Sequence, residues 1–326
     1  MEYTQIPSLE TNASRIGLGT WAIGGWMWGG SDEKEAIDCI HKALDMGITL
    51  IDTAPVYGFG KSEEIVGKAI RQYGGREKIL IATKVGLVWN EGKLSRNLSR
   101  KRILKEVDDS LSRLQIDYID LYQVHWPDPA TPISETAAVL KELLEKKKIR
   151  SIGVSNFSPE QMEEFRKFSP LHANQPPFNL FESSLEKSTL AYCLKHKIAT
   201  LGYGSLCRGL LSGKMKKGAQ FQGDDIRKID PKFQEPHFSQ YLQCVQRLEA
   251  WAKQKHGRSI LSLAVRWALD KGISVALWGA RRAGQLRDID EVWGWKLNDQ
   301  DFQEIDQILR SSLKTSIGPE FMAPPA

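Results

Sequence analysis

The sequence predicts a (β/α)8 TIM barrel that forms one domain over residues 1–326. Short runs of β-forming residues recur along the whole chain, and an amphipathic helical stretch follows each of them. No change in composition divides the chain, and barrels of this type commonly reach this length as one unit. We expect eight runs to form the barrel strands: residues 15–18, 49–52, 79–84, 118–125, 149–154, 173–175, 200–203 and 274–278.

The stretches between these runs open as helices do. Residues 31–35 offer a capping side chain and early negative charge before an apolar face. Ser158 and Ser183 indicate similar helix starts. Residues 208–236 differ, because they are rich in Gly, Lys and Asp and lie between the seventh strand and the next helix. A loop of this length inside a compact domain is usually functional.

Composition narrows the function classes. Hydrophobic residues make up 41% of the chain and charged residues 26%, which is ordinary for a folded protein. The net charge of +5 is spread along the chain, which favours an anionic ligand such as a phosphorylated cofactor over nucleic acid. The first fifteen residues lack a signal-peptide pattern and no membrane-spanning run occurs, so we expect a cytoplasmic protein. The cysteines form no CxxC pair and are expected to be reduced core thiols: Cys39, Cys193, Cys207 and Cys244.

Four polar residues stand at or just after the ends of three successive strands: Asp52, Tyr57, Lys84 and His125. In a barrel, the carboxyl ends of the strands meet at one mouth, so these side chains are expected to form one site. A phenol is a poor acid near neutral pH, and a neighbouring ammonium would favour its anion. Lys84 can play that part, Asp52 can hold Lys84, and a neutral His125 can polarise a carbonyl oxygen. Each residue alone also has an ordinary explanation as a turn former, a solvated cation or packing.

The motifs around these residues resemble those of the aldo-keto reductases over nearly the whole chain. They are residues 50–58 (LIDTAPVYG), 119–125 (IDLYQVH), 152–157 (IGVSNF), 209–214 (GLLSGK) and 278–281 (WGAR). The ending 318–325 (GPEFMAPP) resembles the bacterial general-stress branch. The resemblance implies NADPH-dependent reduction of an aldehyde or ketone, with Tyr57 as the proton donor. It also assigns the four residues above to catalysis, with none of them substituted.

The same resemblance assigns the cofactor site residue by residue. Ser155, Asn156 and Gln175 would hold the nicotinamide carboxamide, and the ring of Tyr203 would stack on the nicotinamide. The pyrophosphate would lie along Gly204, Ser205, Leu206, Cys207 and Arg208, with Lys214. Arg281, Arg282 and Gln285 would hold the ribose 2′-phosphate, which favours NADPH over NADH because guanidinium groups bind a phosphate dianion well. Thr20, Trp21, Asp52, Gly279 and Ala280 complete the expected groove. Apart from the resemblance, Arg227 in the long loop after the seventh strand is expected to close over the cofactor, although a solvated loop cation explains it equally well. Near Ile289 the family often has an asparagine that contacts the adenine. This sequence departs from that pattern, so the resemblance assigns no adenine contact here.

A group of tryptophans is expected at the mouth. Trp21, Trp26 and Trp28 follow the first strand, and Trp126 follows the fourth. They are interpreted as an apolar wall for a small carbonyl substrate, shared with Phe321 and Met322, although core packing explains them equally well.

Other functional interpretations of the sequence motifs are less well supported. Residues 17–22 fit the GxGxx(G/A) dinucleotide pattern, but the glycines after them are expected to prevent a helix from starting at once. Two glycines separate Tyr57 from Lys61 and argue against a helical YxxxK pair. No motif predicts a metal site. A cofactor-sensing binding subunit on the same barrel, like the potassium-channel β subunits, is the alternative to an enzyme, and a monomer is the expected state.

Overall fold

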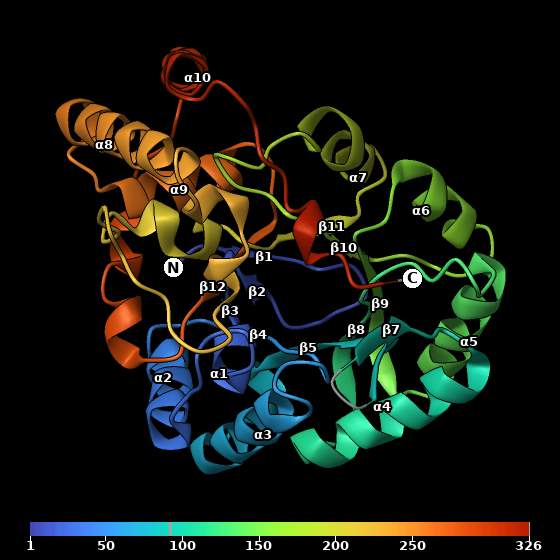
Figure 1. Cartoon of the computed structure of the whole chain (residues 1–326). Helices are drawn as coiled ribbons and strands as arrows, with labels where there is room; N and C mark the ends of the chain where they lie inside the picture. The colour runs from blue at the N-terminus through green and yellow to red at the C-terminus, as the bar shows by residue number, and fades with distance from the viewer. Residues whose placement is uncertain (91–92, 326) are drawn as a thin grey trace.

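The computed structural model describes residues 1–90 and 93–325, and in these residues eight parallel strands close into a barrel (Figure 1). Around the barrel, the strands follow one another in the order β10, β11, β12, β3, β4, β5, β8 and β9. Their bounds are β3 Ile16–Gly19, β4 Leu50–Asp52, β5 Leu80–Val85, β8 Ile119–Val124, β9 Ile149–Ser155, β10 Ala173–Gln175, β11 Ala199–Gly202 and β12 Val275–Gly279. All eight predicted runs are therefore strands, and the TIM barrel prediction is confirmed.

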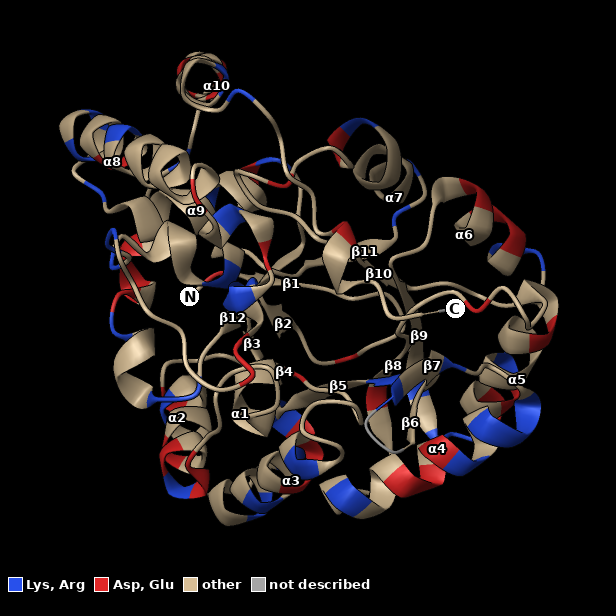
Figure 2. Ribbon diagram, viewed as in Figure 1, with Lys and Arg blue, Asp and Glu red and all other residues tan. Residues whose placement is uncertain are grey.

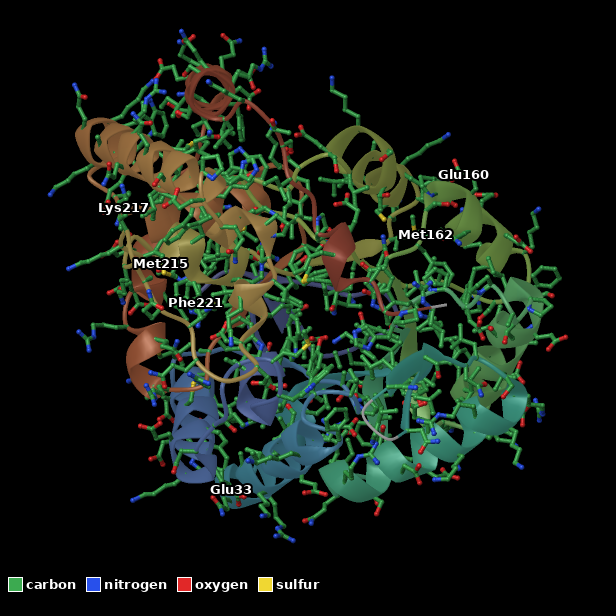
Figure 3. All side chains as sticks on the ribbon, in the orientation of Figure 1. Glu33, Glu160, Met162, Met215, Lys217 and Phe221 are labelled. Atoms are coloured by element: carbon green, nitrogen blue, oxygen red, sulfur yellow. The ribbon has the colours of Figure 1, made fainter. Side chains whose placement is uncertain are left out.

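Helices surround the barrel (Figure 1). Their bounds are α2 Glu33–Asp45, α3 Lys61–Tyr73, α4 Arg100–Leu114, α5 Ile133–Glu145, α6 Pro159–Arg166, α7 Ala191–Lys195, α8 His237–His256, α9 Ile260–Asp270 and α10 Asp299–Ser312. Charged residues lie mainly on these helices (Figure 2). Glu33 and Glu160, in the first turns of α2 and α6, lie at the outer edge of the molecule (Figure 3). The apolar faces of the helices pack inward against strands that are buried along almost their whole length.

Two of the three predicted helix starts are confirmed. Asp32 caps α2 by accepting a hydrogen bond from the backbone N–H of Glu35, and Ser158 forms a reciprocal capping box with Gln161. The third prediction was wrong. Ser183 only begins a turn, and a π-helical turn over Glu186–Leu190 leads into α7 without a side-chain cap.

The segment after β3 also differs from expectation. A one-turn helix, α1 (Trp21–Gly24), starts directly after the strand, although glycines follow it. It ends at Gly25, whose φ of 82° stops the helix. Propensity disfavours a long helix here, but one turn needs few hydrogen bonds, and this one is held by bonds from Ile23 and Gly24 to the carbonyl of Thr20.

Two hairpins were not predicted. β1 (Tyr3–Thr4) pairs with β2 (Ala13–Ser14), and the turn between them brings Ile6 and Leu9 against inward-facing residues of the barrel strands. β6 (Leu87–Asn90) pairs with β7 (Lys93–Arg96) after β5, beyond the left-handed Gly86. β1 and β2 are too short to show a period-2 pattern. The second hairpin matters for function because it extends the mouth of the barrel.

The cysteines are free and buried, as expected for core thiols. In the part of the chain that the structure describes, no helix combines the length and the apolar character needed to cross a bilayer.

Candidate active site

The catalytic candidates meet at the carboxyl end of the barrel. Asp52 ends β4, Lys84 lies in β5 and His125 directly follows β8, while Tyr57 lies in the loop between β4 and α3. The Nζ of Lys84 donates to the Asp52 carboxylate at 2.7 Å and to the Tyr57 hydroxyl at 3.2 Å. The rings of Tyr57 and His125 are 5.9 Å apart and meet edge to face. The four side chains therefore form one group, as the strand ends predicted.

A close approach of two loops fixes the position of Tyr57. A Cβ added to Gly24 would lie 2.5 Å from the backbone carbonyl of Tyr57, and one added to Gly58 would lie 2.2 Å from the carbonyl oxygen of Gly24. Gly58 also has a φ of 66°, in the left-handed region. Only glycine at both positions lets the loops after β3 and β4 touch.

The electrostatics of the site hold Tyr57 protonated. Burial, and then the negative charge of Asp52, raise the pKa of Tyr57 well above its usual value. This direction differs from the expectation that Lys84 favours the phenolate, because burial disfavours the charged phenolate and Asp52, 2.7 Å from the Nζ of Lys84, offsets the charge of the ammonium. Burial also lowers the pKa of Lys84, although Asp52 opposes that shift.

His125 is held neutral. Burial, and then the charge of Lys84, lower the pKa of His125 well below its usual value. Neutral imidazole keeps one N–H donor, which is the form expected to hydrogen-bond a carbonyl oxygen.

Asp52 has a second set of partners that sequence reasoning missed in part. Its other carboxylate oxygen accepts from the Nε2 of Gln175 at 2.8 Å and from the Nε2 of Gln123 at 3.3 Å. Gln123 lies two residues before His125 in β8, so its side chain shares the inward face. That alternation was the signal for Gln123 in the sequence.

The residues expected at the carboxamide and the nicotinamide lie beside this group. The Asn156 side chain donates to the carbonyl oxygen of His125 at 3.0 Å and accepts from the Tyr203 hydroxyl at 3.0 Å. Ser155 donates to the carbonyl oxygen of Gln175 at 2.7 Å. Asn156 has a φ of 62°, which asparagine tolerates better than most residues. These contacts join β9, β10 and β11 at the cavity wall.

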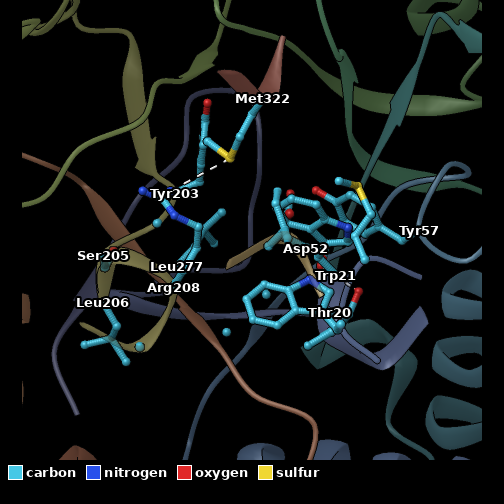
Figure 4. A pocket seen from close by; sticks show the side chains of 18 of the residues that line it. Thr20, Trp21, Asp52, Tyr57, Tyr203, Ser205, Leu206, Arg208, Leu277 and Met322 are labelled. Atoms are coloured by element: carbon cyan, nitrogen blue, oxygen red, sulfur yellow. Dashed lines mark hydrogen bonds between the residues drawn. The ribbon is translucent and has the colours of Figure 1, made fainter. Parts of the chain in front are cut away.

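The site opens into a cavity of about 730 Å³ at the mouth of the barrel (Figure 4). Gly19, which was not expected, lines the cavity. Most of the expected cofactor residues line it too: Thr20, Trp21, Asp52, Ser155, Asn156, Gln175, Tyr203, Gly204, Ser205, Leu206, Arg208, Lys214, Arg227, Gly279, Ala280, Arg281 and Gln285. This volume lies within the range of about 300–1,000 Å³ that is typical of small-molecule and cofactor sites. Two buried indole N–H groups in its wall, from Trp21 and Trp28, have no hydrogen-bond partner within the described residues. They suit the oxygen atoms of a bound ligand.

Three expected cofactor residues lie differently. Cys207 is fully buried and does not line the cavity. The guanidinium of Arg208 is bound by Glu182 and Asp230, each at 2.5 Å. Arg282 lies outside the cavity lining, is 61% exposed and pairs with Glu35.

The remaining cations do face the groove. Arg281 lines the cavity and donates to the carbonyl oxygen of Trp28 at 2.8 Å, and Gln285 accepts from the backbone N–H of Arg281 at 2.9 Å. Arg227 comes from the long loop, pairs with Asp225 and lies over the ring of Trp28 at 5.6 Å. This loop reaches across to the segment after β3, because the Asp224 carboxylate accepts from two backbone N–H groups of that segment.

The expected aromatic wall is present around Tyr57. Trp21 stacks on Tyr57 at 6.0 Å, and Trp28 meets Trp21 edge to face at 5.6 Å. Trp26 and Trp126 also line the cavity. Sequence reasoning missed further apolar residues of this wall: Met27, Val56, Leu87, Leu94 and the end of the chain from Ala323 to Pro325. Leu87 and Leu94 come from the unpredicted hairpin.

Within residues 1–90 and 93–325, no group of three or more His, Cys, Asp or Glu side chains could hold a metal ion.

Comparison with known proteins finds a family and several relatives that this chain resembles. A model of the Aldo/keto reductase family matches residues 15–310. Aldo-keto reductase YhdN of Bacillus subtilis (strain 168) is 59% identical over 326 residues, which are 100% of this chain and 98% of that protein. The NADH-specific methylglyoxal reductase of Escherichia coli (strain K12) is 35% identical over 92% of this chain and 96% of its own. The aldo-keto reductase yakc of Schizosaccharomyces pombe, whose name includes NADP(+), is 33% identical over 89% of this chain and 86% of its own.

Solved structures of aldo-keto reductases are also similar to this chain. The glycerol dehydrogenase AKR11B4 from Gluconobacter oxydans superposes with a TM-score of 0.89 and 51% identity, over 98% of this chain and 99% of that chain. The holo form of aldo-keto reductase AKR11C1 from Bacillus halodurans superposes with a TM-score of 0.79 and 26% identity, over 98% of this chain and 99% of that chain.

Proposed function

The chain belongs to the aldo/keto reductase family, oxidoreductases that reduce carbonyl groups with a nicotinamide cofactor, and on this premise we propose that it uses NADPH to reduce aldehydes or ketones with Tyr57 as the proton donor. One observation carries the assignment of Tyr57. Its hydroxyl lies 3.2 Å from the Nζ of Lys84, in a cavity that His125 also lines.

Each catalytic side chain has one task in this proposal. When bound in the groove, NADPH would supply the hydride that the carbonyl carbon accepts. Tyr57 donates its hydroxyl proton to the carbonyl oxygen as negative charge builds there. Neutral His125 donates a hydrogen bond to the same oxygen and favours the polarised carbonyl. Lys84 stabilises the phenolate that remains, and Asp52 holds Lys84 in place through the 2.7 Å ion pair. In the reverse direction, the Tyr57 phenolate accepts the proton of an alcohol.

Two features support a phosphorylated dinucleotide. Lys214, Arg227 and Arg281 contribute positive charge to the cavity wall, which suits the pyrophosphate and an added 2′-phosphate. Repulsion from Arg282 and Arg227 contributes, after burial, to lowering the pKa of the Arg281 guanidinium, so a dianion beside them would relieve that repulsion. The relatives differ, since one name specifies NADH and another NADP(+), so the preference depends on residues of this chain.

The experiment measures kcat/KM with NADPH and with NADH, following cofactor absorbance with an aldehyde, a ketone and a sugar. We expect NADPH to be preferred. Arg281→Ala should weaken the binding of NADPH much more than that of NADH. Arg282→Ala should have a smaller effect because Arg282 lies outside the cavity lining and pairs with Glu35. Equal losses for both cofactors in Arg281→Ala would refute the 2′-phosphate assignment. Tight cofactor binding without turnover would favour the binding-subunit alternative.

Cytoplasmic location, a role in stress, a single domain and a monomeric state stay predictions from the sequence.

A further inference from the structure

A buried cluster of four charged side chains lies at the cavity wall, where Arg208 lines the cavity, and it includes none of the catalytic candidates. Glu182, Arg208, Asp230 and Lys232 are at most 7% exposed. Arg208 binds Asp230 and Glu182, each at 2.5 Å, and Lys232 binds Glu182 at 2.8 Å. Burial alone would raise the pKa of Glu182, but the charges of Arg208 and Lys232 hold it below its usual range. Two cations and two carboxylates thus compensate one another, so the cluster needs no phosphate to balance it.

The cluster supports the end of the chain, residues 318–325. The Nζ of Lys232 donates to the carbonyl oxygen of Gly318 at 3.2 Å. The Nη1 of Arg208 donates to the Sδ of Met322 at 3.8 Å, drawn as the dashed line in Figure 4. The guanidinium carbon of Arg208 also lies 5.5 Å from the centre of the Phe321 ring. These contacts hold the first part of the segment.

A third cation holds the far end. Arg96, the last residue of β7, donates from Nη2 to the carbonyl oxygen of Pro324 at 2.7 Å and from Nη1 to that of Pro127 at 2.8 Å. Its guanidinium also lies over the ring of Trp126 at 5.3 Å. One side chain therefore joins the hairpin, the loop after β8 and the C-terminal segment.

The segment depends on these anchors because it has little structure of its own. Its helical part is a single turn over Glu320–Met322, and its backbone hydrogen bonds close within residues 319–323. Across the described chain, the hydrogen bonds that join residues 318–325 to the rest come from Arg96, Arg208 and Lys232. Residues 321–325 line the cavity together with Tyr57 and His125. This part of the cavity wall thus takes its position from three cations.

We propose that Arg96, Arg208 and Lys232 are positioning residues that hold residues 318–325 as the outer wall of the carbonyl pocket and thereby set its selectivity for large apolar carbonyls. Glu182 and Asp230 fix the guanidinium of Arg208, and we assign Arg208 to holding this wall rather than to binding the pyrophosphate. The inference rests on the proposed carbonyl reduction.

The first experiment compares benzaldehyde with methylglyoxal in the wild-type enzyme and in a chain that ends at Ile317, before the segment begins. Loss of the wall should raise the KM for benzaldehyde roughly tenfold, as expected when one apolar contact surface is removed from a bound ring. The KM for methylglyoxal, the kcat for both aldehydes and the Kd of NADPH should change less than about twofold. Arg96→Met, Lys232→Met and Arg208→Met should each show the same pattern more weakly.

A double-mutant cycle separates positioning from a general structural effect. Arg96→Met and Lys232→Met should have no further effect on the KM for benzaldehyde in the truncated chain, because the segment that they anchor is gone. Arg96→Lys keeps the charge but loses the two-point grip on Pro127 and Pro324, and should fall between wild type and Arg96→Met. Effects that persist in the truncated chain would overturn the proposal for that residue.

Two further outcomes would refute the inference. If Arg208→Met raised the Kd of NADPH as strongly as the KM for benzaldehyde, Arg208 would be a phosphate ligand. If truncation left the KM for benzaldehyde unchanged, the segment would not be a wall. Should Arg208→Met fail to fold, Arg96→Met and Lys232→Met decide the question.

Amide hydrogen exchange gives a readout independent of turnover. Residues 318–325 should exchange faster in Arg96→Met and Lys232→Met than in wild type, and unchanged exchange would refute the anchors. A wild-type enzyme that reduced no carbonyl would instead refute the proposed function.

Discussion

Replacing Lys84 with methionine tests the ion pair at the centre of the site. Lys84 is fully buried and its Nζ lies 2.7 Å from the Asp52 carboxylate, so the substitution leaves a buried carboxylate without its counter-charge. Losing one partner of such a pair costs about 3–5 kcal/mol of unfolding free energy. Asp52 keeps its hydrogen bonds from Gln175 and Gln123, which places the expected loss near the lower bound, about 3 kcal/mol.

Urea unfolding followed by tryptophan fluorescence measures this loss, and NADPH absorbance with an aldehyde measures turnover. The double variant Asp52→Asn with Lys84→Met removes both charges and should regain most of the stability. It should stay about 10²–10⁴-fold less active than wild type, because no ammonium stabilises the phenolate of Tyr57. Lys84→Met with wild-type stability would refute the charge argument. A double variant with wild-type activity would refute the catalytic role of the pair.

Three other predictions concern the same group. Tyr57→Phe should lower kcat about 10²–10⁴-fold in steady-state assays while the Kd of NADPH, measured by fluorescence, stays unchanged; an unchanged kcat would remove Tyr57 from the mechanism. The raised pKa of Tyr57 and the lowered pKa of His125 predict that kcat for reduction stays constant as pH falls through about 6.5, whereas alcohol oxidation rises with alkaline pH as the phenolate forms; an acidic limb near the ordinary histidine value would contradict this. Gly24→Ala should lower kcat at least about tenfold because its Cβ would lie 2.5 Å from the Tyr57 carbonyl, while Gly284→Ala, with space around it, should behave as wild type; equal activities would show that the loop yields without moving Tyr57.

Local pattern was sufficient for the barrel and for its catalytic group. Each strand is a short β-forming run, and parallel strands with crossover helices leave few alternative folds. The barrel then brings every strand end to one mouth, so Asp52, Lys84 and His125 meet although they are 32 and 41 residues apart in sequence. The family motifs added the groove residues around Ser155 and Tyr203, and these do line the cavity.

Local pattern failed where a long-range contact decides the role of a side chain. Arg208 belongs to a motif that suggests a phosphate ligand, but Glu182 and Asp230, 26 and 22 residues away, bind its guanidinium. The hairpin β6–β7 was missed because its strands are short and only partly buried. Without it, the role of Arg96 could not be seen.

The amino-acid sequence by itself determined the eight strands, two of the three predicted helix starts and the four catalytic candidates that meet at the mouth, since these depend on periodicity, on capping residues and on which residue ends each strand. The tertiary structure alone decided the direction in which the pKa of Tyr57 moves, the partners of Arg208 and the wall formed by the C-terminal segment. These depend on burial and on distances between residues far apart in the chain, and electrostatic energy changes steeply with both.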